Sequence, residues 1–447
     1  MKRYLNLLEG PILPALAALA LPIMATSLIQ MAYNLTDMIW IGRIGANAVA
    51  SVGAAGMFMW LSNGLVMLAK MGGQVKVAHA LGANDHNRAS SYAQSAFQMG
   101  IMFAILFGLI SVFFAPQLIG FFKLNSVQVQ QDAIHYMMIT CGLVFFPYMN
   151  QIFTGILTSM GNSHTSFIAT AIGLVLNIVL DPLFIFGFGF IPAMSVIGAA
   201  LATVLAQAIV FLLFLYAVSK DTLVFNNLHI FTQFHSDEMK EIFKIGLPSA
   251  LHNMLFSGIS MVVARMIAGW GDAAVAVQKV GSQIESISWM TAEGYSAALN
   301  SFVAQNHGAH NEERILKGYR LSMKVMLSWG VFTNFILFVF PQMIFSIFIP
   351  EAAVIPMGVE YLRILAFSQF FMCMEITTAG LFNGLGKTLQ PSIVSVIFTA
   401  IRIPLAFILS RHLGLNGIWW AMTISSVLKG LILFGWYKID VRKPNFL

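Results

Sequence analysis

Five carboxylates lie in stretches of this sequence that otherwise read as lipid-spanning helices: Asp37, Asp181, Glu285, Glu293 and Glu375. An ionisable group costs several kcal/mol in a bilayer unless it meets a partner or lines a cavity, and such groups commonly mark proton or ion pathways. Carboxylates so placed could bind a proton or a cation reversibly. The sequence therefore predicts a protein that moves an ion or a solute across a membrane.

The first of these stretches carries a polar stripe. Gln30, Asn34 and Asp37 follow one another at i, i+4 and i+7, with Tyr33 alongside, so they share one helical face. A polar face on an apolar helix must lie against protein or water rather than lipid. We expect a functional site here, and an interhelical hydrogen-bond cluster is the structural alternative.

A second stretch repeats the pairing of an amide with an acid. Asn177 and Asp181 are one helical turn apart, and Pro182 follows, which removes a backbone donor and frees a carbonyl. Both aspartates lie late in outward-running helices, so they should share the outer half of one bundle. We predict that Asp37, Asp181, Asn177 and Asn34 form a proton or cation site, with Na⁺ a candidate ligand of Asp37, Asn177 and Asp181. Alternatively, Asp181 caps the helix near a kink.

Another polar face falls in the second half of the chain, where residues recur by steps of three and four: Gln278, Ser282, Glu285, Trp289, Glu293, Ser296 and Asn300. Its two acids are about 12 Å apart along a helix axis, too far to share a proton but suited to line a path. We predict Glu285, Trp289 and Glu293 as substrate-pathway residues, together with Gln30 and Tyr33. A structural ion pair is the alternative for Glu285.

Glu375 is the fifth acid, and it aligns with Asn150 of the first half. Its candidate counter-charges are Arg265, Lys279, Arg363 and Arg402, of which Arg402 is nearest mid-membrane. We predict Glu375 and Arg402 as further substrate-pathway residues, and the alternative is a purely structural Glu375–Arg402 pair.

The elements that position these acids are transmembrane helices. Hydrophobic residues make up 58% of the 447 positions and charged residues 9%, far below the roughly 25% charged expected of a soluble domain. Runs of about 20 apolar residues predict twelve spans, near 13–42, 48–70, 91–117, 132–158, 165–187, 192–218, 243–269, 273–300, 318–347, 357–384, 391–411 and 414–437. The fold class is therefore an all-α polytopic membrane protein.

Orientation follows from the loop cations. With both termini in the cytoplasm, that side collects most of the Lys and Arg residues, and the opposite side has only Arg43, Lys123 and Arg411. We expect a multi-pass protein of the plasma membrane, the inner membrane of a bacterium, with no removable signal peptide. Cys141 and Cys373 fall in apolar stretches, which disfavours a disulfide framework or a metal site.

The two halves of the chain are an internal repeat. Pro22 matches Pro248, and Arg88 matches Arg314, both at a spacing of 226 residues. Six spans per half is an even number, so the two six-helix bundles should be related by a pseudo-twofold axis along the membrane normal. We predict an N-terminal lobe at 1–218, a cytoplasmic linker at 219–241 and a C-terminal lobe at 242–447, with Pro22 as a hinge.

Absent motifs narrow the function. No Gly-rich loop ends in Gly-Lys-Ser or Gly-Lys-Thr, and no His-Glu-x-x-His occurs. We therefore expect an ion gradient as the energy source, no cofactor beyond H⁺ or Na⁺ as coupling ion, and no enzyme activity. Two alternatives stay open: a flippase for lipid-linked oligosaccharides, expected to show a cationic cavity, and an intramembrane enzyme.

Several segments together resemble the multidrug and toxic compound extrusion (MATE) transporters over nearly the whole length. They are Leu21-Pro22, Asn34 to Gly42, Ala80 to Ala83, Asn177 to Pro182, Gly281 to Ser286, Phe302 to Gly308 and Asn383 to Lys387.

The resemblance implies two six-helix lobes that export cationic amphipathic compounds in exchange for H⁺ or Na⁺. Asp37, Asn177 and Asp181 look like the first-lobe cation site of the DinF-like branch. Another branch carries an acid in the first helix of the second lobe, whereas residues 247–269 here have none. The resemblance thus favours coupling through Asp37 and Asp181, in a functional monomer that binds small cationic compounds and no nucleic acid.

Overall fold

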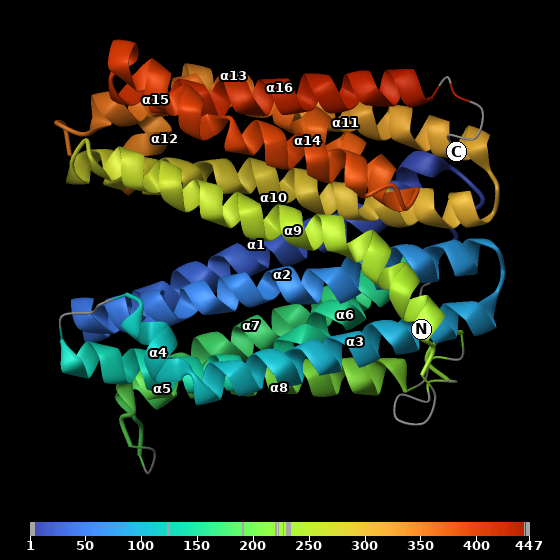
Figure 1. Ribbon diagram of the computed structural model, residues 1–447, viewed down its shortest axis with the longest axis horizontal. Coiled ribbons are helices and arrows are strands. Elements are labelled where there is room, and N and C mark those ends of the chain that lie inside the picture. Colours follow the sequence, from blue (N-terminus) through green and yellow to red (C-terminus); the bar gives the residue numbers. More distant parts are fainter. Residues whose placement is uncertain are drawn as a thin grey trace. The chain divides into compact units, whose positions relative to one another are not determined.

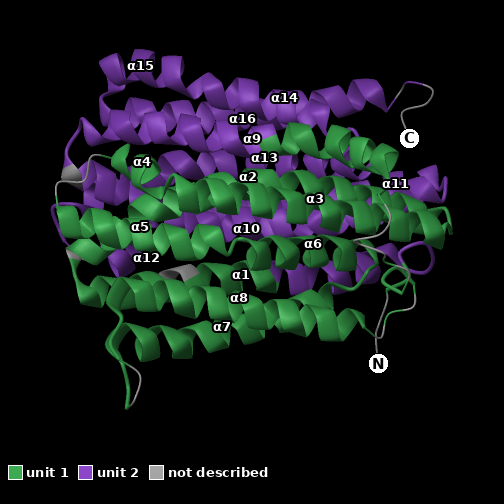
Figure 2. Cartoon of the chain, turned by 60° about the horizontal axis from the view of Figure 1, so that its bottom comes forward, with its two compact units in different colours: residues 1–6, 25–250 green, residues 7–24, 251–447 purple. Residues whose placement is uncertain are grey.

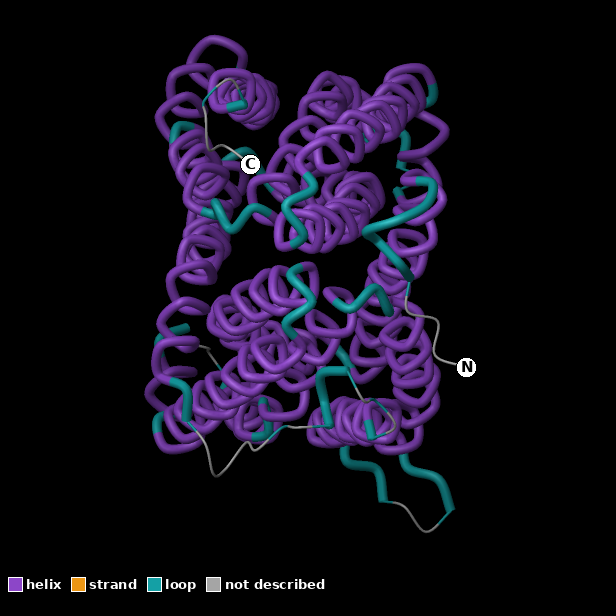
Figure 3. Tube along the Cα trace, turned by 90° about the vertical axis from the view of Figure 1, so that its right-hand side faces the viewer, coloured by secondary structure: helices purple, strands orange, loops and turns teal. Residues whose placement is uncertain are grey.

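A computed structural model gives the fold (Figure 1). It describes residues 5–122, 126–189, 192–219, 221, 223–226, 228, 234–349, 351–441 and 443, without the side chains of residues 34, 35, 46 and 272. The predicted role of Asn34 therefore falls outside the described residues. Within these ranges all regular structure is helical and no strand occurs (Figure 3).

In the described residues, each half of the chain forms eight helices. The first half has α1 Ile12–Ile44, α2 Ala46–Gly82, α3 His86–Phe113, α4 Ala115–Gly120, α5 Val127–Gly142, α6 Phe145–Ser159, α7 Ser163–Phe186 and α8 Ser195–Val218. The second half has α9 Ser236–Ala268, α10 Asp272–Gly308, α11 Glu312–Val339, α12 Pro341–Phe348, α13 Ile355–Gly384, α14 Leu389–Ala400, α15 Arg402–Leu413 and α16 Leu415–Asp440.

The helices account for most of the twelve membrane crossings predicted from the sequence. Ten spans in the described residues are long and apolar enough to cross a membrane, with α14 and α15 counted as one, and α5 with α6, bent by 42°, makes an eleventh. α10, the counterpart of α2 in the repeat, is also 37 residues long. It is not among these spans because its polar face lowers its mean hydropathy. The predicted all-helical membrane fold with two homologous six-helix bundles is confirmed.

Packing divides the described chain into two compact units (Figure 2). Unit 1 comprises residues 1–6 and 25–250, and unit 2 comprises residues 7–24 and 251–447. The chain changes unit inside α1 and again inside α9, in each case two residues after the helix-internal proline, Pro22 or Pro248. Each unit thus includes the first part of the helix that begins the other half of the sequence.

Close backbone contacts hold these exchanged segments. In unit 1, a Cβ on Gly246 of α9 would lie 2.0 Å from the carbonyl oxygen of Leu68 in α2. In unit 2, a Cβ on Gly294 of α10 would lie 2.9 Å from the Cα of Met24 in α1. Only glycine leaves room at these crossings. The first and second helices of the repeat thus cross closely in both units, and the glycine lies on α9 in one crossing and on α10 in the other.

Each unit has its own core. In unit 1, α2 packs against α3, α5 and α6, and α7 packs against α8. In unit 2, α13 packs against α10, α11 and α16. Of the apolar spans it is the most buried, because 78% of the residues in its most apolar stretch are buried. These central helices position the buried polar groups described next.

Candidate functional site

The two predicted aspartates meet in unit 1. Asp37 of α1 and Asp181 of α7 are close neighbours that act on each other electrostatically. Two ionised carboxylates have no hydrogen to donate, and Asp37 Oδ1 and Asp181 Oδ2 are buried without a hydrogen-bond donor among the described residues. Buried polar atoms are normally paired, and a proton shared by the two carboxyl groups would supply the hydrogen that two ionised acids lack.

Helix α7 supplies one internal partner for the acids. Asn177 Nδ2 donates to Asp181 Oδ1 over 3.1 Å, one turn along the helix. Asp181 and Asn177 are 0% and 1% exposed. Pro182 lies inside α7 and cannot donate to the carbonyl of Ile178, so the helix carries a free carbonyl beside the acid.

Two tyrosines and a threonine complete the surroundings of the acids. Tyr33 lies one turn before Asp37 on α1, and its hydroxyl is 3.3 Å from Thr203 Oγ1 of α8. Tyr136 of α5 is buried and lies within electrostatic reach of both aspartates. Four helices of unit 1 therefore contribute to the acid pair: α1, α5, α7 and α8.

No described cation balances this cluster. The groups that act on Asp37 and Asp181 are the two acids themselves, the Asn177 amide and the burial of the site. Gln30, predicted on the same face of α1, is exposed rather than part of the cluster. We refer to Asp37, Asp181, Asn177, Tyr33 and Tyr136 as the acidic cluster.

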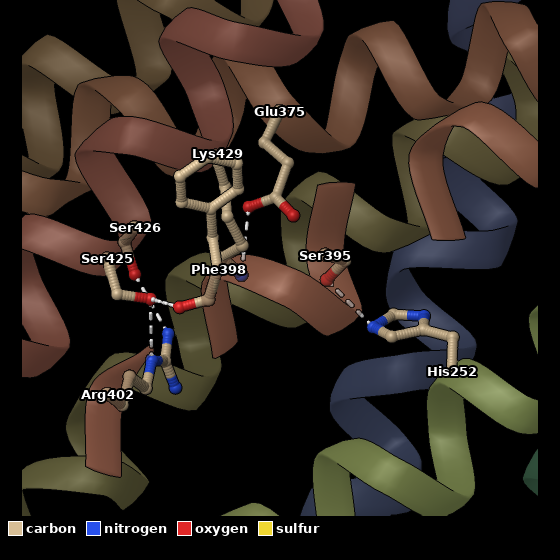
Figure 4. A network of polar contacts seen from close by, with 8 residues as sticks. All are labelled: His252, Glu375, Ser395, Phe398, Arg402, Ser425, Ser426 and Lys429. Atoms are coloured by element: carbon tan, nitrogen blue, oxygen red, sulfur yellow. Dashed lines mark hydrogen bonds and ion pairs between the residues drawn. The ribbon is translucent and has the colours of Figure 1, made fainter. Parts of the chain in front are cut away.

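Unit 2 holds a second buried ionic group, and it corrects one prediction. Glu375 of α13 pairs with Lys429 of α16 over 3.1 Å, and both are nearly buried (Figure 4). The structural alternative given for Glu375, an ion pair with Arg402, is therefore wrong, and the substrate-pathway role of the two residues stays a prediction. Lys429 reaches the acid because α13 and α16 pack along their lengths.

Arg402 instead binds hydroxyl groups. Its Nε donates to Ser425 Oγ over 2.9 Å and one terminal nitrogen donates to Ser426 Oγ over 3.1 Å. Ser425 in turn donates to the carbonyl of Phe398 over 2.7 Å. Figure 4 shows these contacts beside the Glu375–Lys429 pair. The guanidinium is thus fixed on α16 while 8% exposed.

Glu285 of α10 completes the ionic group. It lies near Gln369 and is acted on by the charges of Arg402 and Lys429. Two acids and two cations therefore neutralise one another, and we call Glu285, Glu375, Arg402 and Lys429 the balanced cluster. Nearby in Figure 4, His252 Nε2 lies 2.9 Å from Ser395 Oγ.

The predicted polar face of α10 divides in two. Gln278 contacts the Tyr361 hydroxyl at 3.4 Å and Ser296 donates to the Ile376 carbonyl, so these residues point into unit 2 with Glu285. Ser282, Trp289 and Glu293 are exposed. The structure therefore does not bring Trp289 and Glu293 together with Glu285.

Sequence reasoning missed several of these residues. Lys429 had a usable signal, since a lysine inside the apolar span 415–440 is as informative as a buried acid. Gln369, Tyr136 and Thr203 had none, because uncharged polar residues are common in membrane spans.

The described residues contain no group of three or more His, Cys, Asp or Glu side chains arranged to hold a metal ion. Cys141 and Cys373 are buried free thiols. The acidic cluster supplies two carboxyl groups, so a bound metal cation would need ligands from amides, carbonyls or water as well.

Comparisons with known proteins agree with this architecture. The MatE family matches residues 22–183 and 248–408, one segment in each half. The probable multidrug resistance protein NorM of Thermotoga maritima is 31% identical, covering 96% of this chain and 93% of that protein, and the multidrug export protein MepA of Staphylococcus aureus is 22% identical, covering 95% and 93%. A solved MATE structure in the straight conformation is 25% identical, covers 98% of each chain and has a TM-score of 0.90. The chain belongs to the MATE family of membrane transporters.

Proposed function

We propose that this protein is a cation-coupled multidrug efflux antiporter, in which Asp37 and Asp181 bind the coupling ion. The observation that carries the proposal is the buried acid pair, which has unpaired carboxylate oxygens and no cation facing it in the described residues. A purely structural acid in a membrane protein is usually paired. Two acids at one site without a counter-charge are therefore best explained by a coupling ion that binds and is released in each transport cycle.

The contacts of the pair favour H⁺ over Na⁺. Asn177 presents its amide nitrogen to Asp181, so it acts as a hydrogen-bond donor and not as an oxygen ligand. A sodium ion would require the amide to turn or water to enter. One proton shared between the two carboxyl groups would need no additional ligand.

The exported compounds are proposed to be cationic and amphipathic. Multidrug resistance and export proteins are among the relatives of this chain. An unneutralised pair of acids attracts organic cations, and exposed Gln30, Trp289 and Glu293 are proposed to line the substrate path. We further propose that the protein works as a monomer in a bacterial inner membrane, with both termini in the cytoplasm.

The coupling would be competitive. Protonation of Asp37 and Asp181 removes the negative charge that favours a bound drug cation, so proton and drug weaken each other's binding by the same factor. Pro22 is proposed as the hinge of α1, because the chain passes from unit 2 to unit 1 two residues later.

The test is dye efflux from proteoliposomes with a pH gradient and a sodium gradient imposed separately. We expect efflux under the pH gradient, and its loss in Asp37→Asn and Asp181→Asn. Drug-triggered proton movement that survives in Asp37→Asn would overturn the proposed coupling site, and efflux driven only by sodium would overturn the choice of ion.

The flippase alternative would lack this dye response. It is expected to require an excess of cations for a pyrophosphate group, whereas the acidic cluster has none in the described residues and the balanced cluster has no excess. Export of a lipid-linked sugar without dye efflux would favour it.

A further inference from the structure

A basic cavity lies in unit 2, and none of its lining residues belongs to the balanced cluster. It measures ≈ 590 Å³ and lies between residues 8–12 and the start of α11. Its charged lining consists of Arg314, Lys317, Arg320 and Glu313. Three cations thus face one acid, and Lys317 lies 2.6 Å from that acid.

The cavity is also apolar on one side. Leu8, Pro11 and Ile12 line it together with Leu321 of α11. Ile12 is the first residue of the membrane span α1, so this wall lies where a span begins. A cavity at a span end with one cationic side and one apolar side fits a ligand that has an anionic head and a hydrocarbon body.

Arg314 joins the two segments that line the cavity. Its guanidinium donates to the carbonyls of Leu7, Glu9 and Gly10 over 2.9–3.1 Å, and Asn306 donates to Leu7 as well. These bonds fix the segment before α1 on unit 2. Arg314 is thereby engaged, whereas Lys317 and Arg320 are exposed, and no described acid lies within ion-pair distance of Arg320.

The internal repeat indicates that these two cations are not needed for folding. α3 and α11 have equal lengths and align residue by residue. Arg314 corresponds to Arg88, but Lys317 and Arg320 correspond to Ser91 and Gln94. The same helix in the same kind of bundle therefore forms without them, so both cations can be replaced without loss of the helix.

We propose that this cavity binds the phosphate-bearing headgroup of an anionic phospholipid, with Lys317 and Arg320 contacting the phosphate and the apolar wall contacting the lipid's glycerol and first acyl carbons. The shared chemistry is a phosphate anion, and the apolar wall selects the lipid over free phosphate. The site is independent of the acidic cluster and of the transported ion.

The test is native mass spectrometry of the full chain in detergent, titrated with phosphatidylglycerol, phosphatidylcholine or inorganic phosphate. We expect tighter binding of phosphatidylglycerol than of phosphatidylcholine. Lys317→Ser combined with Arg320→Gln installs the residues of α3 and should weaken phosphatidylglycerol binding by about tenfold. Retained thermal stability of this variant shows that it folds.

The matched control is Lys240→Gln combined with Lys438→Gln, which removes two exposed cations elsewhere. We expect this control to bind phosphatidylglycerol like the unaltered protein. An equal loss in both double variants would show general surface attraction and overturn the site. Equal binding of the two lipids, or competition by millimolar inorganic phosphate, would overturn the lipid assignment.

Discussion

The two units use buried charge in opposite ways. Unit 1 places two acids together with no cation facing them in the described residues, whereas unit 2 joins two acids to two cations. The acids of unit 1 lie on α1 and α7, whereas the charges of unit 2 lie on α10, α13, α15 and α16, so the two clusters occupy different positions of one repeat. The difference therefore arises from side chains on a shared scaffold.

The repeat shows what the scaffold itself requires at the acidic cluster. Asp37 corresponds to Val263 in unit 2, and Asp181 corresponds to Ala406. Val263 and Ala406 belong to one buried hydrophobic cluster. An apolar core at this place is thus compatible with the fold, so the aspartates are not required for its architecture.

The reverse comparison holds for the balanced cluster. Glu285 corresponds to Met59 and Arg402 to Asn177, and Glu375 corresponds to Asn150, which donates to Gln207 of α8. In both units this position of the fourth span thus contacts the sixth span, as an amide pair in unit 1 and as an ion pair in unit 2. Unit 2 thus carries charges that cancel where unit 1 has neutral residues, whereas the charges of unit 1 do not cancel.

The largest effect is expected from neutralising the acidic cluster. Asp37→Asn or Asp181→Asn should reduce gradient-driven dye efflux to the level of empty liposomes, because the amide cannot take up and release a proton near neutral pH. Efflux of a fluorescent cation from proteoliposomes measures this. Asp237→Asn, which changes an exposed acid at the start of α9, is the control and should transport normally.

The next largest effect is expected from unbalancing unit 2. Lys429→Met or Glu375→Gln alone leaves a buried charge unpaired and should destabilise the protein by about 3 kcal/mol. The double variant removes both charges and should recover most of that loss. Thermal unfolding in detergent measures all three, and additive losses in the double variant would show that the 3.1 Å pair contributes little.

Much of this architecture follows from the sequence because its signals are local. Apolar runs predicted the spans, and the matched prolines indicated the repeat. A spacing of four residues predicted that Asn177 lies next to Asp181 on one helical face. The meeting of Asp37 with Asp181 also followed, since equal depth on parallel helices limits where they can be. The partner of Glu375 did not follow, because choosing Lys429 over Arg402 depends on how α13 packs against α16.

A smaller effect is expected when one acid of each cluster is replaced by the residue at the equivalent position of the other unit. Asp37→Val installs the unit 2 residue and relieves one of two like charges, so stability should rise by about 1 kcal/mol. Glu285→Met installs the unit 1 residue and leaves an excess cation, so stability should fall by about 2 kcal/mol. Thermal unfolding of both in one detergent is the measurement, and changes of the same sign would contradict the contrast between the clusters.

The smallest effect is expected from Tyr33, an uncharged residue of the acidic cluster. Tyr33→Phe removes the hydroxyl that lies 3.3 Å from Thr203 and keeps the ring, so it should cost about 1 kcal/mol at most. Tyr33 is half-buried on α1, one turn from Asp37, and it does not carry the coupling charge. Efflux should therefore persist under a pH gradient, and its complete loss would place Tyr33 in the proton path with the two acids.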